Sequence, residues 1–411
     1  MKPTRVLVTG LGPVTSIGIG AQAFHRAQLA GTSGTRHLTR FTIGGTECYA
    51  AGEIDLPPEH EASRRLALGT DRCAQLALVA AKLAVADARL QPAALDRSRM
   101  GVVIGTGIGG AQTWQDSATA MTQASPARLS SKTVTKAMCN SATALVAIEY
   151  GCMGPTSTPV VACAAGAEAI VAACQMICSG EADVVLAGGA EAPLVPMVLA
   201  GFAGTRALAP PTDTPHAASR PFSADRVGFV LAEGAAILVI EAADHAARRG
   251  AHALAEIAGY GRTTDAFHVT APASDGDGAR RAVEAALRNA GLTPDDISYI
   301  NAHGTATVLN DEAEVRALQR ALGTAAKRVP VSSTKSQTGH ALGASAAIEA
   351  VAAVQSVSTG TIPPTINLTT PDPTLSMDFV SSAPRRADVA AALSNSFGFG
   401  GHNVVLAFTR P

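Results

Sequence analysis

Runs of β-branched residues alternate with alanine-rich runs along nearly the whole chain. Runs typical of strands lie at residues 5–9, 101–104, 158–162, 182–186 and 228–240, and again at 253–259, 299–302, 329–333 and 391–395. Runs typical of helices lie at residues 71–88, 164–179, 277–290, 311–322 and 343–359. Because this alternation is typical of layered α/β proteins, we expect helices packed on the faces of a sheet.

The strand and helix pattern restarts after residues 241–244, which places the boundary between two halves at about residues 245–252. A chain of 411 residues is too long for one small core. Its length fits two domain-sized units or one large duplicated domain. We therefore predict an N-terminal half of residues 1–250 and a C-terminal half of residues 251–411.

The composition excludes several classes of protein. Charged residues make up 16% of the chain and hydrophobic residues 47%, which predicts extensive burial and not disorder. The net charge of −1 provides no broad basic field for nucleic acid. The seven cysteines are odd in number and form no Cys-x-x-Cys pair. This pattern argues against a disulfide framework or a structural zinc site and favours a reducing compartment.

No segment has the character of a signal peptide or a membrane span. The chain starts with basic residues, but glycines and a proline at residues 10–13 interrupt the apolar run that follows them. The most apolar long stretch, residues 184–204, contains Glu191 and two prolines and would make a poor transmembrane helix. We predict a soluble, cytoplasmic protein that does not bind a membrane.

Cys163 lies between the predicted strand at residues 158–162 and the predicted helix that follows it. A thiol at such a junction faces the N-terminus of the helix, where unpaired N–H groups and the helix dipole favour an anion. Only a few per cent of an ordinary thiol is ionised at neutral pH, so a lowered pKa would activate it. Cys163 is a candidate nucleophile, although an apolar-flanked cysteine is more often a core residue.

Residues 105–110 match the G-x-G-x-x-G pattern of dinucleotide-binding loops and follow a predicted strand. Such a site also needs an acidic residue about 20 residues further along the chain. The chain has no aspartate or glutamate between Ser117 and Ile148. We therefore expect these glycines to allow close backbone packing or to line an apolar pocket.

Three segments of the second half consist of an apolar strand that ends in polar, turn-forming residues. They lie at residues 300–311, 331–340 and 395–403, and the first two contain His303 and His340. Functional sites of α/β proteins form at strand ends. A single histidine there is commonly structural, but two histidines together with Cys163 form a candidate nucleophile with acid–base partners. The two histidines lack the spacing of a zinc-binding helix, so a metal site would need them to converge in the fold.

The motifs that carry these residues resemble those of a known family. They are Ala-Cys-Ala-Ala-Gly at residues 162–166, Asn-Ala-His-Gly-Thr at 301–305, Lys-Ser-x-Thr-Gly-His at 335–340 and Gly-Phe-Gly-Gly at 398–401. Residues 6–12, 220–222 and 228–234 extend the similarity over nearly the whole chain. The chain resembles the β-ketoacyl-[acyl-carrier-protein] synthases of the elongating type, which are condensing enzymes of the thiolase superfamily.

The resemblance implies a thiolase-like α/β fold, with two similar halves in α-β-α-β-α layers and a dimeric assembly. It implies an acyl carrier protein as partner, which delivers substrates on its own 4′-phosphopantetheine arm. No cofactor or metal is expected. Cys163 would take the acyl chain as a thioester, and His303 and His340 would drive decarboxylation of malonyl-carrier protein. The resulting enolate would attack the acyl-Cys163 thioester and give a 3-oxoacyl product two carbons longer.

The resemblance also assigns supporting residues. The backbone N–H groups of Cys163 and Phe399 would form the oxyanion hole, and Phe399 would gate the acyl pocket. Gly400 and Gly401 would let the loop approach the substrate closely and move. Lys335 and Glu314 would form a structural and electrostatic pair, because a buried lysine needs an opposite charge to keep its proton.

Other assignments concern the substrate. By resemblance, Thr305 and Thr307 would bind the phosphopantetheine arm, and Ile108 would line the acyl pocket. Ordinary turn chemistry is the alternative for the two threonines. The candidates for docking an acidic carrier protein are Arg65, Arg128 and Arg206, for which a solvated surface charge is the alternative.

The chain departs from the usual family pattern at three positions. Val161 stands where many relatives have threonine, Gln337 where methionine is common, and His402 where many bacterial relatives have threonine. These changes remove no catalytic group, but they bear on the shape of the pocket and on the dimer surface.

Three related classes fit less well. A thiolase needs a second, late cysteine, and no cysteine follows Cys178. Initiating condensing enzymes have a Cys-His-Asn set of catalytic residues instead. The histidine at position 340 argues against such a set in this chain. A non-catalytic chain-length subunit of a ketosynthase heterodimer typically lacks the nucleophile that Cys163 provides. The sequence leaves open whether the pathway makes fatty acids or polyketides, and whether the partner is a second copy or a paralogous chain-length subunit.

Overall fold

The computed structural model describes residues 4–42, 48–57, 69–123 and 129–411. Within these residues the α-helices are α1 (Ala21–Leu29), α3 (Arg72–Asp87), α4 (Ala111–Gln123), α5 (Thr133–Ala137), α6 (Ser141–Tyr150), α7 (Ala165–Cys178), α8 (Pro196–Gly204), α9 (Ala243–Arg248), α10 (Asp277–Ala290), α11 (Val308–Leu322), α12 (Lys335–Thr338) and α13 (Ser345–Thr359). Two short 3-10 helices near the site are η5 (Ala162–Ala164) and η9 (Leu342–Ala344).

The strands of the same residues are β1 (Val6–Thr15), β2 (Gly18–Ile19), β3 (Arg36–His37), β4 (Ala50–Gly52), β5 (Met100–Gly105), β6 (Thr156–Ser157), β7 (Val184–Glu191), β8 (Leu231–Ala232), β9 (Gly234–Ala242), β10 (Ala255–Thr264), β11 (Tyr299–Asn301), β12 (Pro330–Ser332), β13 (Thr361–Ile362), β14 (Asp378–Phe379), β15 (Arg385–Arg386), β16 (Ala391–Gly398) and β17 (His402–Thr409). Most of them belong to one sheet, whose order is β14-β12-β11-β16-β17-β10-β1-β9-β7-β5-β6.

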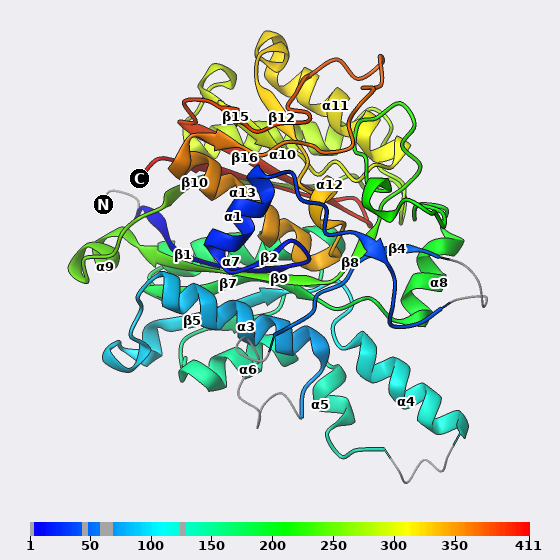
Figure 1. The fold of residues 1–411 in the computed structure, drawn as a ribbon. Helices are drawn as coiled ribbons and strands as arrows, with labels where there is room; N and C mark the ends of the chain where they lie inside the picture. Colours follow the sequence, from blue (N-terminus) through cyan, green and yellow to red (C-terminus); the bar gives the residue numbers. More distant parts are fainter. Residues whose placement is uncertain (1–3, 43–47, 58–68, 124–128) are drawn as a thin grey trace.

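The elements stack in five layers (Figure 1). Helix α3 covers strands β1 and β9 on the outside of the first half, and α6 packs against β5. Helices α7 and α13 lie side by side in the middle layer, between the strands of the two halves. Helix α10 covers β10 and β17 on the outside of the second half and packs on α11. This arrangement confirms the predicted thiolase-like α-β-α-β-α fold.

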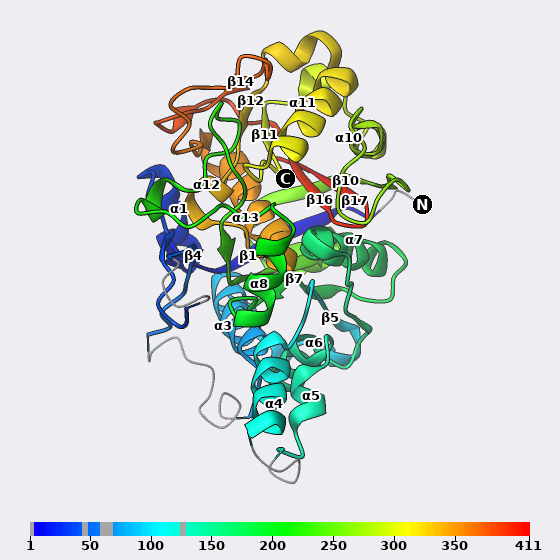
Figure 2. The same cartoon turned by 90° about the vertical axis from the view of Figure 1, so that its right-hand side faces the viewer.

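The two halves share one continuous sheet because β1 pairs with β10 in antiparallel register. The chain passes from the first half to the second through α9. The division at residue 250 stays a prediction. Helices α4 and α5 project from the lower end of the molecule, and α8 lies above them (Figure 2). None of the helices in the described part of the chain has the length and apolar character needed to cross a membrane.

Several predicted elements differ from the observed ones. Strand β1 runs through Gly10 and Gly12, which we expected to interrupt it, because helix α3 packs so closely on these glycines that a Cβ on Gly12 would lie 1.9 Å from the carbonyl oxygen of Ala80. The predicted strand at 158–162 is wrong: only Thr156–Ser157 pairs, and the chain then enters a tight turn. The predicted strand at 228–240 is broken at Glu233, where β8 leaves to pair with β4 and β9 pairs with β1 and β7.

Candidate active site

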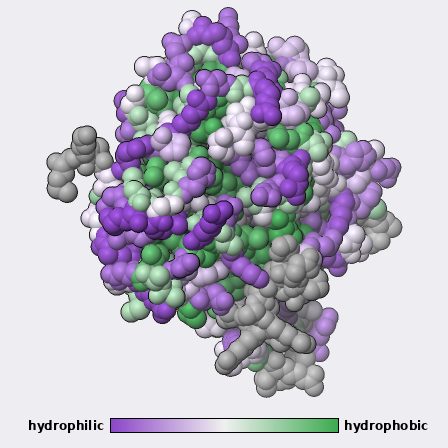
Figure 3. Space-filling view, turned by 60° about the vertical axis from the view of Figure 1, so that its left-hand side comes forward, coloured by the Kyte–Doolittle hydropathy of each residue, from purple (hydrophilic) through white to green (hydrophobic). Residues whose placement is uncertain are grey.

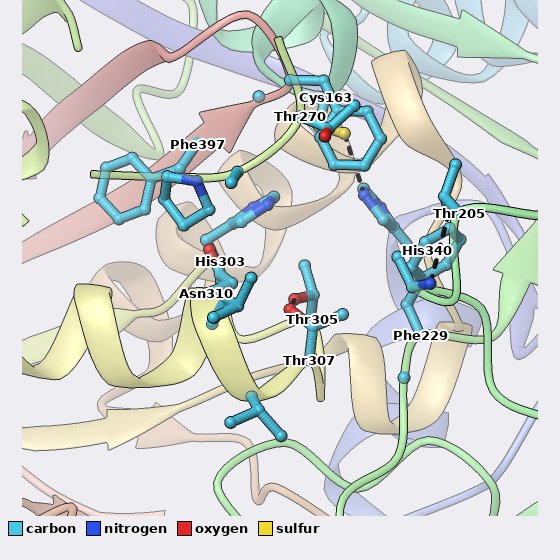
Figure 4. A pocket seen from close by; sticks show the side chains of 18 of the residues that line it. Cys163, Thr205, Phe229, Thr270, His303, Thr305, Thr307, Asn310, His340 and Phe397 are labelled. Atoms are coloured by element: carbon cyan, nitrogen blue, oxygen red, sulfur yellow. Dashed lines mark hydrogen bonds between the residues drawn. The ribbon is translucent and has the colours of Figure 1, made fainter. Parts of the chain in front are cut away.

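A cavity of about 310 Å³ opens where the carboxyl-terminal ends of strands from both halves meet. Cys163 enters it from the first half, and His303 and His340 enter it from the second. In Figure 4 the Cys163 thiol lies beside the His340 ring, while His303, Thr305 and Thr307 face the same space from the neighbouring segment. The structure therefore brings together the three residues that the sequence proposed as one chemical set.

Cys163 occupies η5, directly before α7. The preceding residue, Ala162, has a φ of 50°, which is uncommon for a residue other than glycine and turns the chain sharply into the helix. The Cys163 Sγ lies 3.1 Å from Nε2 of His340. Burial raises the pKa of the Cys163 thiol to about 12, although Lys335 and the backbone N–H of Phe399 act in the opposite direction. Our expectation of a favoured thiolate is thus wrong for the unacylated protein, because desolvation outweighs both of these influences.

His340 lies between α12 and η9 and is held on both sides of its ring. Its Nδ1 lies 2.9 Å from the hydroxyl of Ser345, and its backbone N–H donates to the carbonyl of Val230 at 2.7 Å. The ring meets Phe229 edge to face. Burial and the charge of Lys335 lower the pKa of His340 well below its usual value, so the imidazole is neutral.

His303 follows strand β11, and its ring stands nearly perpendicular to that of His340, with 5.5 Å between the ring centroids. The ammonium of Lys335 lies 3.2 Å from Nδ1 of His303 and 2.7 Å from its carbonyl oxygen. Burial lowers the pKa of His303 well below its usual value, and Lys335 and His340 lower it further. Because an ammonium can only donate, Nδ1 must accept, and the single proton of the neutral ring sits on Nε2.

The predicted ion pair of Lys335 with Glu314 is wrong in its partner, although the charge of Lys335 does reach Glu314, whose pKa is raised by burial and lowered by Lys335. The Lys335 ammonium forms its ion pair with Glu349 on α13, and both side chains are 2% exposed. The Glu314 carboxylate instead accepts the backbone N–H groups of His303 and Gly304, each at 2.8 Å, and the side-chain amide of Asn395. Glu314 therefore positions the His303 loop, while Glu349 balances the lysine charge.

Glu349 is a functional candidate that the sequence analysis missed. Its pKa is raised to about 7 by burial, against the influence of Lys335. A signal was present, since Glu349 is the sole charged residue among the 17 residues of the predicted helix at 343–359. A single carboxylate in such an apolar helix needs a buried partner.

The Gly-Phe-Gly-Gly segment lies against the nucleophile. A Cβ built on Gly398 would be 3.2 Å from the amide nitrogen of Cys163, so the two backbones approach closely. Phe399 is partly buried, and its ring centroid lies 6.2 Å from that of Phe202. Gly400 and Gly401 have φ angles of 85° and 74°, which glycine adopts without strain. Gly401 lines the cavity, whereas Gly400 is exposed and bonds to Val269.

The predicted substrate contacts fall into three groups. Thr305 and Thr307 line the cavity, with their hydroxyls 2.9 Å apart, and Arg206 lines its mouth. Ile108 packs against the apolar cluster that contains Cys163. Arg65 and Arg128 lie outside the described residues, so their role in docking the carrier protein stays a prediction.

The three positions that depart from the family pattern lie close to the site. Gln337 is buried and donates to the carbonyl of Gln28 at 2.8 Å. The His402 ring lies over Gly400, 3.0 Å from where a Cβ on that glycine would be. Val161 is partly buried and packs against the main core.

The thiol and the two imidazoles also have the geometry of a possible metal site. Their ligand atoms all lie within 4.8 Å of one another, so the convergence that a metal site would require does occur. Sulfur and imidazole nitrogen are ligands that zinc accepts. The same three groups suit a nucleophile with two neutral hydrogen-bonding partners.

Residues 3–246 match the model of the "Beta-ketoacyl synthase, N-terminal domain" and residues 254–369 that of the "Beta-ketoacyl synthase, C-terminal domain". The chain is 44% identical to a 3-oxoacyl-[acyl-carrier-protein] synthase 2 of Synechocystis sp., over all of this chain and 99% of the relative. It is 42% identical to the enzyme of the same name from Staphylococcus aureus, over 99% and 98% of the two chains.

Solved structures agree with these relatives. A ketosynthase of a type II polyketide synthase, in complex with its acyl-carrier protein and bound to the hexaketide, has a TM-score of 0.91 and 35% identity over the whole of both chains. A β-ketoacyl synthase from Burkholderia phymatum has the same TM-score and 33% identity over 99% and 100% of the two chains. The chain therefore belongs to the β-ketoacyl synthase family and is, like these relatives, an acyltransferase of the ketosynthase type.

Proposed function

We propose that this enzyme extends an acyl chain held on Cys163 by a decarboxylative Claisen condensation with malonyl-[acyl-carrier-protein]. The observation that carries the proposal is the convergence of one thiol and two neutral imidazoles in one cavity of a chain that belongs to this family. The product is a 3-oxoacyl-[acyl-carrier-protein] two carbons longer than the acyl group.

Acylation of Cys163 is the first step. His340 Nε2, 3.1 Å from Sγ, accepts the thiol proton as the sulfur attacks the incoming thioester. The bond to the carrier's sulfur breaks, and the proton passes from His340 to that leaving thiolate. The raised pKa of Cys163 makes this transfer necessary, because few thiolates form spontaneously.

Decarboxylation of the malonyl group is the second step. The carboxylate leaves as CO2, and its electron pair forms an enolate whose oxygen carries negative charge. The His303 Nε2–H, fixed by the Lys335 contact at Nδ1, donates to that oxygen. His340 can donate beside it, because the Ser345 hydroxyl at its Nδ1 is able to donate as well as accept.

Condensation is the third step. The enolate carbon attacks the acyl carbonyl on Cys163, and the backbone N–H groups of Cys163 and Phe399 stabilise the tetrahedral oxyanion. Collapse breaks the bond to the Cys163 sulfur, and the released thiolate takes up one proton from solvent. The close approach of Gly398 to the Cys163 amide supports this placement of the two donors.

The substrates arrive on the phosphopantetheine arm of an acyl carrier protein, which brings the thioester from outside the enzyme. Thr305 and Thr307, whose hydroxyls face the cavity, bind the arm, and Arg206 at the mouth contacts the acidic carrier protein. The acyl chain passes toward Ile108 and its apolar neighbours. A relative named 3-oxoacyl-[acyl-carrier-protein] synthase 2 and a similar ketosynthase of a type II polyketide synthase fit either a fatty-acid or a polyketide pathway.

A second protomer, identical or paralogous, covers one end of the sheet. Strand β6 is the last strand in the sheet order, so it presents an edge that can pair with another strand. Near it along the chain, Ile148 and Met153 are 70% and 74% exposed, which is unusual for large apolar side chains that stay in water. On the face of the molecule drawn in Figure 3, polar and apolar residues are interspersed.

Intact-protein mass spectrometry tests the proposal. The enzyme is incubated with acyl-carrier proteins of varied acyl length and then with malonyl-carrier protein, with Cys163→Ala as the control. We expect an acyl adduct on the wild-type enzyme alone, lost as a product two carbons longer appears. No adduct with any donor, even with a candidate partner subunit present, would instead indicate a non-catalytic chain-length subunit.

A further inference from the structure

Glu191 is a buried carboxylate beside the cavity to which the proposed chemistry assigns no role. It ends strand β7 and is 0% exposed. Its Oε1 accepts the Thr106 hydroxyl at 2.8 Å and the backbone N–H groups of Ile108 and Gly109 at 3.1 and 3.3 Å. Its other oxygen accepts the backbone N–H groups of Gly107 and Gly343.

These hydrogen bonds join two segments that are far apart in sequence. One is the glycine-rich loop at residues 106–110, and the other is the turn η9. The two segments touch directly, since a Cβ on Gly343 would lie 2.5 Å from the amide nitrogen of Gly107 and 2.7 Å from Oε2 of Glu191. The glycine motif that resembled a nucleotide site thus wraps around an internal carboxylate.

Both joined segments contribute to the apolar space around the nucleophile. Ile108 and Leu342 belong to the same apolar cluster as Cys163, and Leu342 also lines the cavity. Leu342 has a φ of 44°, an uncommon conformation for this residue type, and the Glu191 bond to the next residue helps to hold it. Movement of either segment would change the room available to an acyl chain.

We infer that Glu191 is a positioning residue that clamps the loop at 106–110 onto η9 and thereby limits the length of acyl chain that Cys163 accepts. The inference rests on the proposed function. Burial raises the pKa of the Glu191 carboxyl, while its five donors favour the ionised form. This negative charge also adds to the raised pKa of the Cys163 thiol.

Glu191→Gln is the most direct test, because the amide keeps the shape of the side chain. Each carboxylate oxygen now accepts at least two donors, whereas the amide NH2 can accept none. One of the two sets of N–H groups must then lose its partner, and the clamp opens on that side. The gentler variant Thr106→Val removes only the hydroxyl, which donates to Oε1 and accepts the backbone N–H of Gly109.

The experiment is a competition in which purified enzyme receives an equimolar mixture of short-chain and long-chain acyl-carrier proteins. The initial acyl adducts on Cys163 are counted by mass spectrometry. We expect the ratio of long to short adducts to rise by about fivefold for Glu191→Gln, the effect of losing roughly one buried hydrogen bond. Thr106→Val shifts the ratio in the same direction by about twofold.

Glu241→Gln is the matched control. Glu241 is also 0% exposed and lies on β9 at the opposite end of its pairing with β7, away from the residues that line the cavity. We expect this variant to keep the wild-type ratio even where its stability falls. If Glu191→Gln does not fold, Thr106→Val decides the question.

An unchanged ratio in the Glu191 and Thr106 variants, or a shift toward shorter chains, would overturn the inference while leaving the proposed function intact. The proposed function fails separately, when the wild-type enzyme forms no adduct at all. A uniform loss of rate for every chain length in Glu191→Gln would indicate a purely structural residue.

Discussion

The two sides of the cavity position their reactive groups by different means. Cys163 is held by backbone geometry and apolar packing, on a sharp turn between β6 and α7 within a largely apolar cluster. The histidine side is held by buried charges and hydrogen bonds. There Lys335 is paired with Glu349 and touches His303, and Glu314 fixes the backbone of the His303 loop.

This difference indicates a division of labour. Burial keeps the Cys163 thiol protonated, and burial together with Lys335 keeps both imidazoles neutral. The Cys163 sulfur contacts His340, while His303 contacts Lys335. Acylation should therefore depend on the Cys163–His340 contact, and decarboxylation should depend more on the side that Lys335 and Glu349 support.

The strongest test of this division removes His303. In His303→Ala, we expect acyl-Cys163 to form at close to the wild-type rate, because the Cys163–His340 contact remains. Decarboxylation should fall by about 10³-fold, since the enolate loses one of its hydrogen-bond donors. Acylation is followed by mass spectrometry and decarboxylation by release of labelled CO2. Equal loss of both steps would contradict the division.

The next test concerns the buried charges. Glu349→Leu leaves the Lys335 ammonium buried without its partner, which should lower the free energy of unfolding by about 3 kcal/mol or more. The double variant Lys335→Met/Glu349→Leu removes both charges and should recover most of that loss. Chemical denaturation measures both values. If Glu349→Leu were as stable as the wild type, the Lys335–Glu349 pair would not stabilise the histidine side of the cavity.

A smaller effect is expected in the pH dependence. Burial is the main cause of the lowered pKa values of both histidines and Lys335 lowers them further, so Lys335→Met should raise them part of the way toward the ordinary value near ~6.5. At that upper limit, about one quarter of an imidazole is neutral at pH ~6. Condensation by the variant should therefore lose up to about fourfold between pH ~8 and pH ~6 for each histidine that must be neutral, while the wild type stays flat. A flat profile in the variant would mean that burial alone keeps the histidines neutral.

Local patterns predicted the long elements of the fold well. Helix α10 begins and ends at the predicted residues, Asp277 and Ala290, because left-handed glycines flank a strongly amphipathic run. The segment at 158–162 has the composition of a strand, yet Pro159 lacks an N–H donor and Ala162 turns the chain toward α7. Side-chain composition does not reveal such a turn, which brings Cys163 to His340, a residue 177 positions along the chain.

The site was predictable in its members but not in its connections. Strand-end position brought His303 and His340 into the candidate set, and the structure places both in the cavity with Cys163. The partner of Lys335 could not be predicted, because the fold decides which buried carboxylate lies near the ammonium. That carboxylate is Glu349 on α13, 14 residues after Lys335. The prediction of a lowered pKa for Cys163 failed for a related reason, because the degree of burial is a property of the whole fold.

The smallest expected effect distinguishes substrate binding from chemistry. The Thr305 hydroxyl faces the cavity and bonds to that of Thr307, away from the reacting sulfur, so it should contribute to binding of the carrier arm alone. Thr305→Val should raise the KM for malonyl-carrier protein by about threefold, as expected for a weak hydrogen bond worth ~0.6 kcal/mol, with little change in kcat. Thr9→Val is the control, because the Thr9 hydroxyl is also buried but bonds to Glu241 outside the cavity. A fall in kcat with an unchanged KM would instead mean that Thr305 acts on the reacting centre. Thr305 would then belong with His303 among the residues that act on the reacting atoms.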